Sequence, residues 1–388
     1  MSFKLLKKIH TTGSGAAPGE DVYIFDICPC TDHSVMVSSS DHHLTHFDRE
    51  LNAVSRFVAH SDSITAVEAP ISSNNSLVVT SSADKSIRGW DVRCGSGNAV
   101  FQQHCTQEVL SLSCLKGVSS NLLAAACGND IHFYDFRMSG SATDNSDGSS
   151  KLVSKMRDMH TEEVTALSFC PGGTMLLSGG EDGLVNVIDI SIAGSEECVI
   201  SVLNNDCPVR RLGSFGAHGE GVYVTTSVET LNCWHAQSAQ RLGQYSDLRE
   251  QFPSCDYIVD CWAESGADAG SDQDASLSLL CGSYEGDGKV FCVYPDRLAP
   301  LAPLQPPQPS PTAAATGMGE APASSPGGHS AMLRCCSSGC FTSAHTGKRL
   351  LLTGGEDSLL CLWELGAGRT AGSSAGAARA SRLAFQPY

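Results

Sequence analysis

The sequence lacks the features that mark membrane, secreted and nucleic-acid-binding proteins. It has no apolar run near the ~20 residues of a spanning helix, and its basic N-terminus lacks a signal peptide's apolar stretch. Basic residues are scarce, since 25 Lys and Arg stand against 42 Asp and Glu, a net charge of −17. That charge opposes binding to phosphate backbones and anionic membranes. Aromatic residues, at 6 %, are too few to indicate a surface on which the bases of single-stranded nucleic acid would stack. We therefore expect a soluble cytoplasmic or nuclear protein that binds proteins, not nucleic acid or membrane.

Charged residues are also few, at 17 % against a typical ~25 %. Glycine and proline, with 38 and 16 copies in 388 residues, are frequent enough for a fold with many tight turns. Hydrophobic residues make up 41 %, which provides a sizeable core. This balance favours one large all-β unit over a bundle of long helices.

The 18 cysteines are scattered singly through apolar segments, where they read as small buried hydrophobes of a reduced protein. The clusters Cys28-Pro29-Cys30 and Cys335-Cys336 with Cys340 have no second pair at zinc-finger spacing. His42, His43 and His46 would lie in a strand with 42 and 46 about 13 Å apart, too far for one ion. We therefore expect neither a metal nor a cofactor.

One pattern recurs along the chain. An apolar strand is followed by small residues, a turn that usually carries an acid, and a second alternating strand. The seven copies are Val35 to Asp48, Leu77 to Arg93, Leu122 to Arg137, Met175 to Ile190, Val222 to His235, Leu279 to Tyr294 and Leu350 to Glu364. Asp41 and Asp84 are 43 residues apart, and Asp91 and Asp135 are 44 apart. Both spacings fall within the ~40–45 residues of the WD40 repeat.

The strongest copies share four residue types at matching offsets. The sets are His60, Thr80, Asp84 and Trp90; His329, Thr353, Asp357 and Trp363; and, with Ile188 at the Trp position, His160, Ser178 and Asp182. They resemble the structural tetrad of WD40-repeat β-propellers, and the resemblance extends over nearly the whole chain. Ser178 to Ile190 and Leu351 to Trp363 further resemble the middle and final repeats of one family member.

The resemblance implies a single seven-bladed propeller over residues 1–367, monomeric by itself. In each tetrad it implies that the carboxylate accepts from the imidazole, the imidazole from the hydroxyl, and that the hydroxyl contacts the indole N–H. The segment Phe3 to Ile9 would close the ring by adding a strand to the last blade. Residues 139–150, 264–276 and 299–328 read as disordered inserts, and 368–388 as a flexible tail.

No nucleophile with a matching base stands out. The pairs Gly179-Gly180 and Gly354-Gly355 lie in hairpins, not before helices, so they cradle no phosphate. His160, Ser178 and Asp182 repeat an architectural set and are not read as a catalytic triad. We therefore expect no enzyme but a non-catalytic scaffold for protein–protein interaction.

Two repeats end in a box that allows a narrower alternative. The residues are Trp90, Asp91 and Arg93 in one and Tyr134, Asp135 and Arg137 in the next. Val78 to Arg93 resembles the box of WD40 substrate receptors in cullin-4-type ubiquitin ligases, in which the two arginines would engage an adaptor bidentately. Alternatively, Asp91 and Arg93 serve only the local turn between two strands, as these residues do in other WD40 proteins.

The other expected binding surface is the face formed by the loops before each first strand. Residues that enter it are mostly acidic: Asp21, Ser63, Glu108, Glu163, Arg210 and Asp256. Their charge favours a basic peptide as partner.

Overall fold

The structure is a computed structural model of the chain. It describes residues 3–11, 22–30, 34–70, 76–95, 97–115, 121–135, 152–192, 196–216, 218–246, 248–263, 277–305, 328–342 and 349–365. No helix among these residues is long and apolar enough to cross a membrane.

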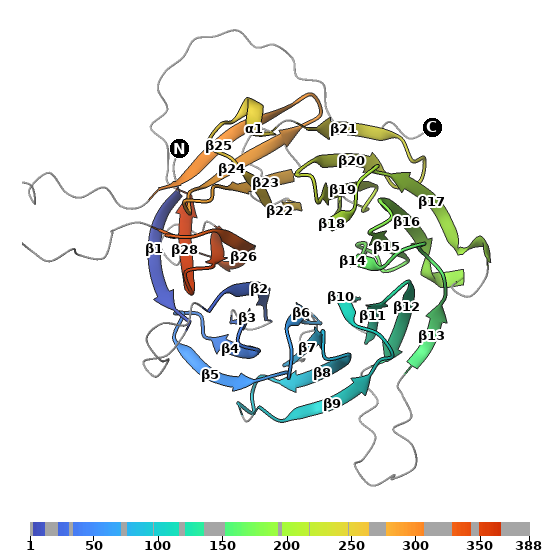
Figure 1. Cartoon of the computed structure of the whole chain (residues 1–388), viewed down its shortest axis with the longest axis horizontal. Helices are drawn as coiled ribbons and strands as arrows, with labels where there is room; N and C mark the ends of the chain where they lie inside the picture. Colours follow the sequence, from blue (N-terminus) through green and yellow to red (C-terminus); the bar gives the residue numbers. More distant parts are fainter. Residues whose placement is uncertain are drawn as a thin grey trace, which may run out of the picture.

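The strands form seven four-stranded antiparallel blades arranged in a ring around a central channel (Figure 1). The inner strands are β2 (Ile24–Pro29), β6 (Ile64–Glu68), β10 (Val109–Cys114), β14 (Val164–Phe169), β18 (Val209–Phe215), β22 (Tyr257–Ala263) and β26 (Leu333–Thr342). The second strands are β3 (Val35–Ser39), β7 (Leu77–Ser82), β11 (Leu122–Cys127), β15 (Met175–Gly180), β19 (Gly221–Thr226), β23 (Leu277–Gly282) and β27 (Arg349–Gly355).

The third strands are β4 (His43–Phe47), β8 (Ser86–Asp91), β12 (Asp130–Asp135), β16 (Leu184–Asp189), β20 (Leu231–His235), β24 (Gly288–Tyr294) and β28 (Leu359–Leu365). The outer strands are β5 (Ala53–Val58), β9 (Ala99–His104), β13 (Leu152–Met156), β17 (Val199–Asn204), β21 (Arg241–Tyr245), β25 (Arg297–Gln305) and β1 (Phe3–His10). Short helices are η1 (Ile190–Ile192), η2 (Glu196–Cys198) and α1 (Leu248–Gln251). Each predicted repeat is the hairpin of a second and a third strand, so the seven-bladed prediction is confirmed.

Burial explains the sequence pattern of the strands. The second strands are almost wholly apolar or small because neighbouring blades cover both of their faces, as in β3 and β11. The outer strands β5 and β9 alternate between exposed and half-buried residues because one face meets solvent. The hydrophobic core is divided into seven clusters, and each lies between two adjacent blades.

The ring closes as the sequence predicts. β1 pairs antiparallel with β28, from Phe3 opposite Leu365 to His10 opposite Leu359. The start of β1 also pairs in parallel with the end of β25, which joins the last two blades into one eight-stranded sheet. One boundary of the prediction is wrong: residues 299–305 belong to β25 and are not part of an insert. The other expected inserts, the remainder of that one up to 327 and the tail lie outside the described residues.

Side chains connect the inner strands of neighbouring blades. The Ser111 and Ser113 hydroxyls accept hydrogen bonds from the backbone N–H groups of Leu167 and Phe169, each at 3.0 Å. The Tyr257 hydroxyl accepts from the Leu333 N–H at 2.8 Å. These bonds hold the blades in register around the channel, since no backbone ladder links one inner strand to the next.

All seven inner strands carry a β-bulge near their first residue. The pairing shifts between Ile24 and Asp26 in β2, and at the equivalent place in each other inner strand. The extra residues are Phe25, Thr65, Leu110, Thr165, Arg210, Val259 and Arg334. A bulge redirects its side chain, and all of these lie where the inner strands begin. We call this end of the ring the top face.

Candidate protein-binding surface

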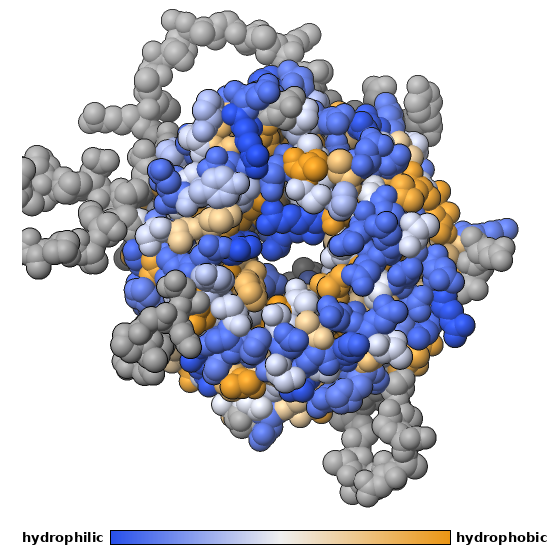
Figure 2. All heavy atoms as spheres, in the orientation of Figure 1, coloured by the Kyte–Doolittle hydropathy of each residue, from blue (hydrophilic) through white to orange (hydrophobic). Residues whose placement is uncertain are grey.

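The inner strands surround a cavity of about 590 Å³ that runs along the channel. Five of the bulge residues line it: Phe25, Thr65, Leu110, Thr165 and Arg210. Figure 2 shows that the central opening is hollow and bordered largely by hydrophilic residues. The channel is therefore open to polar groups of a partner.

Charged side chains pair with one another inside the channel. Arg211 donates to Asp260 at 3.0 Å, and Asp26 accepts from the N–H groups of Ile27 and Val67. Burial raises the pKa of Asp26 and of Asp260 against the opposing attraction of Arg211. The Asp260 charge in turn raises the pKa of Arg211. One arginine thus faces two carboxyl groups.

Two bulge arginines at the channel mouth already have acidic partners. Arg334 donates from Nε to Glu356 at 2.7 Å. Arg210 lies 3.6 Å from Glu229 and donates to the Ile258 carbonyl of the neighbouring blade at 2.9 Å. These pairs neutralise the positive charge on this side of the mouth.

Exposed carboxylates gather on the top-face loops of the second, third and fourth blades. We call this set the acidic arc: Asp62, Glu108, Glu162, Glu163 and Glu181. Asp62, Glu108 and the Glu162-Glu163 pair precede inner strands, and the Glu181 N–H donates to the Glu163 carbonyl at 2.9 Å. Lys85 lies in the β7–β8 turn on the same face. The arc borders the side of the mouth where the bulge residues are Thr65, Leu110 and Thr165.

Of the six residues predicted for the top face, five are described. Glu108, Glu163 and Arg210 are exposed, while Ser63 is half-buried. Asp256 accepts from the Tyr284 N–H at 2.9 Å, so its carboxylate caps a neighbouring turn. Asp21 lies outside the described residues. Three further top-face acids were not predicted: Asp62 adjoins Ser63, Glu162 adjoins Glu163, and Glu181 bonds through its N–H to the Glu163 carbonyl.

The first arginine box lies on the opposite face, which we call the bottom face. Trp90 is buried, and Arg93 follows β8 with a side chain 71 % exposed. Its Nε and terminal amine donate to the two oxygens of Asp91 at 3.0 and 2.7 Å. These hydrogen bonds lower the pKa of Asp91. The Arg93 guanidinium thus carries an intramolecular carboxylate partner at the surface.

The second box is only partly described. Tyr134 is buried at 6 % exposure, and its hydroxyl hydrogen-bonds His132 Nδ1 at 3.1 Å. Asp135 is half-buried at the end of β12. Arg137 lies outside the described residues.

The structure brings the first tetrad together as a chain of hydrogen bonds. His60 Nδ1 lies 3.0 Å from Asp84, and His60 Nε2 lies 2.7 Å from the Thr80 hydroxyl. The Trp90 indole N–H donates to the same hydroxyl at 2.9 Å. Burial lowers the pKa of His60, so the imidazole bonds in its neutral form. Burial would raise the pKa of Asp84, but hydrogen bonds from Ser86 and His60 outweigh it and lower the value to about 2.

The last blade repeats this geometry, and the fourth blade repeats most of it. His329 lies 2.9 Å from Asp357 and 2.8 Å from Thr353, which accepts from the Trp363 indole at 2.8 Å. In the fourth blade, His160 lies 3.1 Å from Asp182 and 2.9 Å from Ser178. Ile188 stands at the Trp position of this blade and has no N–H to donate to the Ser178 hydroxyl. These sets give each turn its hydrogen-bond partners and hold it to the preceding loop.

One group of side chains was missed by the sequence analysis, which expected no metal. The ligand atoms of Cys105, Cys127 and His132 lie within 4.8 Å of one another. A hydrogen bond from the Cys127 thiol lowers the pKa of Cys105. A signal was present in the sequence, because Cys105 stands four residues before its inner strand, as His60, His160 and His329 do before theirs.

Comparisons with known proteins agree with the fold. A family model described as WD domain, G-beta repeat matches residues 51–91 and 151–189. The chain is 23 % identical over 296 residues to the WD repeat-containing protein 89 homolog of Dictyostelium discoideum, covering 74 % of this chain and 75 % of that protein. An uncharacterized WD repeat-containing protein of Schizosaccharomyces pombe is 24 % identical over 201 residues, covering 47 % and 56 %.

A solved structure has the same architecture. A chain in the crystal structure of the Mitotic Checkpoint Complex superimposes with a TM-score of 0.63 at 15 % identity, covering 94 % of this chain and 96 % of that one. At this identity the likeness shows the fold.

Proposed function

The chain is a WD40-repeat β-propeller similar to WD repeat-containing protein 89, and from this premise we propose that it is a non-catalytic scaffold whose top face binds a basic segment of a partner protein. The observation that carries the proposal is the acidic arc beside an open channel mouth. Five exposed carboxylates on adjacent loops attract lysine and arginine side chains and speed their encounter.

The channel mouth supplies the second part of the binding surface. Thr65, Leu110 and Thr165 are half-buried and line the cavity next to the arc. A peptide that lies across them covers apolar and hydroxyl groups while its cationic side chains reach the arc. Deeper in the channel, Asp26 and Asp260 offer carboxyl oxygens to a longer side chain.

Charge reversal tests this surface with a matched control. The test variant carries Glu163→Lys and Glu181→Lys on the top face. The control carries Glu50→Lys and Glu197→Lys, two exposed positions in bottom-face loops with the same change in total charge. We expect the test variant to bind a fluorescent lysine-rich peptide about tenfold more weakly or worse, a change of about 1.4 kcal/mol. Equal weakening in both variants would contradict a top-face site.

The second candidate function is a substrate receptor of a cullin-4-type ubiquitin ligase. It is supported by the exposed Arg93 guanidinium at the end of the Trp90 to Arg93 box. A bidentate site on an adaptor would compete with Asp91 for this group. An adaptor pull-down that is unchanged by the combined Arg93→Ala and Arg137→Ala substitutions would overturn this candidate.

A further inference from the structure

The third blade, β10 to β13, has none of the residues that build a tetrad. Cys105 replaces the histidine, Ala125 the hydroxyl residue and Gly128 the acid. The imidazole, hydroxyl and carboxylate with which blades two, four and seven hydrogen-bond a turn to its neighbouring loop are therefore absent from these positions. Tyr134 stands at the Trp position, and its hydroxyl contacts Cys105 Sγ at 3.7 Å and His132 Nδ1 at 3.1 Å.

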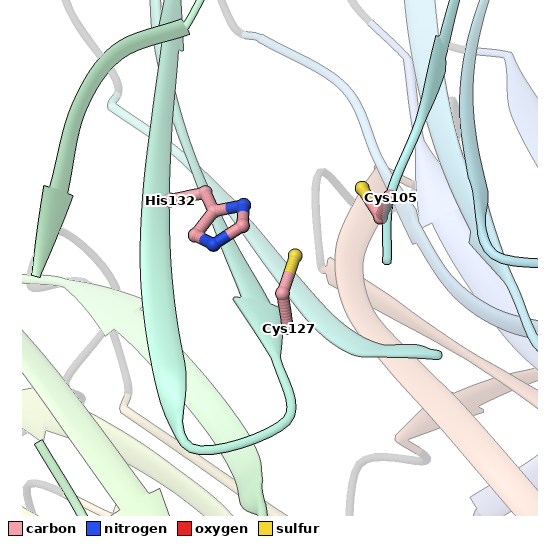
Figure 3. A group of neighbouring side chains, drawn as sticks. All are labelled: Cys105, Cys127 and His132. Carbon is pink, nitrogen blue, oxygen red and sulfur yellow. The ribbon is translucent and has the colours of Figure 1, made fainter. Parts of the chain in front are cut away.

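Three side chains lie close together at the corresponding position of the third blade. Cys105 comes from the loop between β9 and β10, Cys127 ends β11, and His132 lies in β12 (Figure 3). Their ligand atoms all lie within 4.8 Å of one another. Cys127 and His132 are 3 % and 4 % exposed, and Cys105 is half-buried, which leaves a route from solvent. The Cys105 N–H donates to the Lys85 carbonyl at 2.7 Å, which anchors the β9–β10 loop to the β7–β8 turn of the second blade.

The imidazole has the surroundings of a metal-binding histidine. Its Nδ1 lies 3.1 Å from the Tyr134 hydroxyl. Its Nε2 is buried without a hydrogen bond and lies 3.8 Å from a carboxylate oxygen of Asp130. With Nδ1 bonded to Tyr134, the unpartnered Nε2 is the nitrogen available to a metal, and the hydrogen bond at the other nitrogen orients the ring as in ligating histidines.

We propose that Cys105, Cys127 and His132 bind a zinc ion that replaces the missing tetrad of the third blade. Thiolate and imidazole are the ligands that zinc prefers. Ligands at about 2.3 Å in a tetrahedron are about 3.8 Å apart, so small side-chain rotations close the present separations. Binding forms two Zn–S bonds and one Zn–N bond, and any thiol protons go to solvent. Water fills the fourth position. The ion ties the β9–β10 loop to the β11–β12 hairpin.

Zinc content of the full-length chain tests the site. After purification with a phosphine reductant and exposure to zinc, a moderate chelator removes loosely held metal, and mass spectrometry counts what remains. We expect wild type to retain about one zinc ion more per chain than Cys127→Ser or His132→Gln. The matched control is Cys114→Ser, a buried cysteine of the same blade outside the group, which should retain as much as wild type.

Cobalt provides a readout that does not depend on whether a variant folds. Wild-type chain freed of metal and titrated with Co²⁺ should develop the thiolate-to-cobalt absorption and visible bands of a tetrahedral site. Absence of these bands in folded wild type overturns the proposal, as does equal zinc retention in wild type and a folded Cys127→Ser variant. A Cys105–Cys127 disulfide found by peptide mapping in protein that retains no zinc also overturns it.

Discussion

A chain that lacks residues 1–10 is expected to lose its cooperative unfolding transition and to self-associate. β1 buries Phe3 and half-buries Leu5 and Ile9 against the last two blades and the first. Full burial of such side chains is worth about 1.5–3 kcal/mol each, so the partly buried set contributes roughly 3–6 kcal/mol, much of a typical stability of about 5–15 kcal/mol. Deletion also exposes the edge of β28, where unpaired backbone groups recruit other strands.

The measurement is urea unfolding followed by size-exclusion chromatography of the truncated chain. A synthetic peptide of residues 1–11 added in trans should restore a monomer with a cooperative transition. The control peptide replaces Phe3, Leu5 and Ile9 by serine and should not. A truncated chain that unfolds at the wild-type midpoint without any peptide would show that β1 does not close the ring.

Thr353→Val is expected to lower the free energy of unfolding by about 2–6 kcal/mol. The hydroxyl of Thr353 is the shared partner of His329 Nε2 and the Trp363 indole, and all three side chains are buried. Valine keeps the shape but leaves both groups without a partner. Each buried group left unsatisfied costs about 1–3 kcal/mol.

Thr225→Val is the matched control in the fifth blade. Thr225 is 1 % exposed, but its hydroxyl makes only a 3.4 Å contact with the Arg211 carbonyl. We expect this change to cost less than about 1 kcal/mol. Similar losses in the two variants, measured by chemical denaturation, would mean that the tetrad bonds contribute little beyond packing.

The repeats with a strong signature were predictable because the polar groups of each turn need hydrogen-bond partners, and side chains of the same repeat supply them. His60, Thr80 and Asp84 stand at offsets fixed by the hairpin, so their spacing identifies the hairpin. β25 was not predictable in the same way. Pro300 and Pro303 lack an N–H and read as part of a linker, yet an outer strand can accommodate residues that do not donate to a ladder.

Residues of the candidate surfaces were likewise predictable only where their position in the sequence determines their place in the fold. Glu108 and Glu163 were expected on the top face because each directly precedes an inner strand, whereas Glu181 lies in a hairpin turn that reaches this face only in the folded ring. Cys105, Cys127 and His132 come from a loop and two strands. A search for paired cysteines at fixed spacing misses such a group, because the fold and not the spacing unites it.

The most direct test of the proposed scaffold is site-specific photo-crosslinking in the native cell. A photoreactive residue replaces Leu110 at the channel mouth, and in a second variant it replaces Glu50 in a bottom-face loop. We predict that position 110 captures a discrete protein through a segment rich in Lys and Arg, and that Glu163→Lys with Glu181→Lys removes the adduct. Capture from position 50 alone, or capture at position 110 that survives the charge reversal, would contradict a basic partner on the top face.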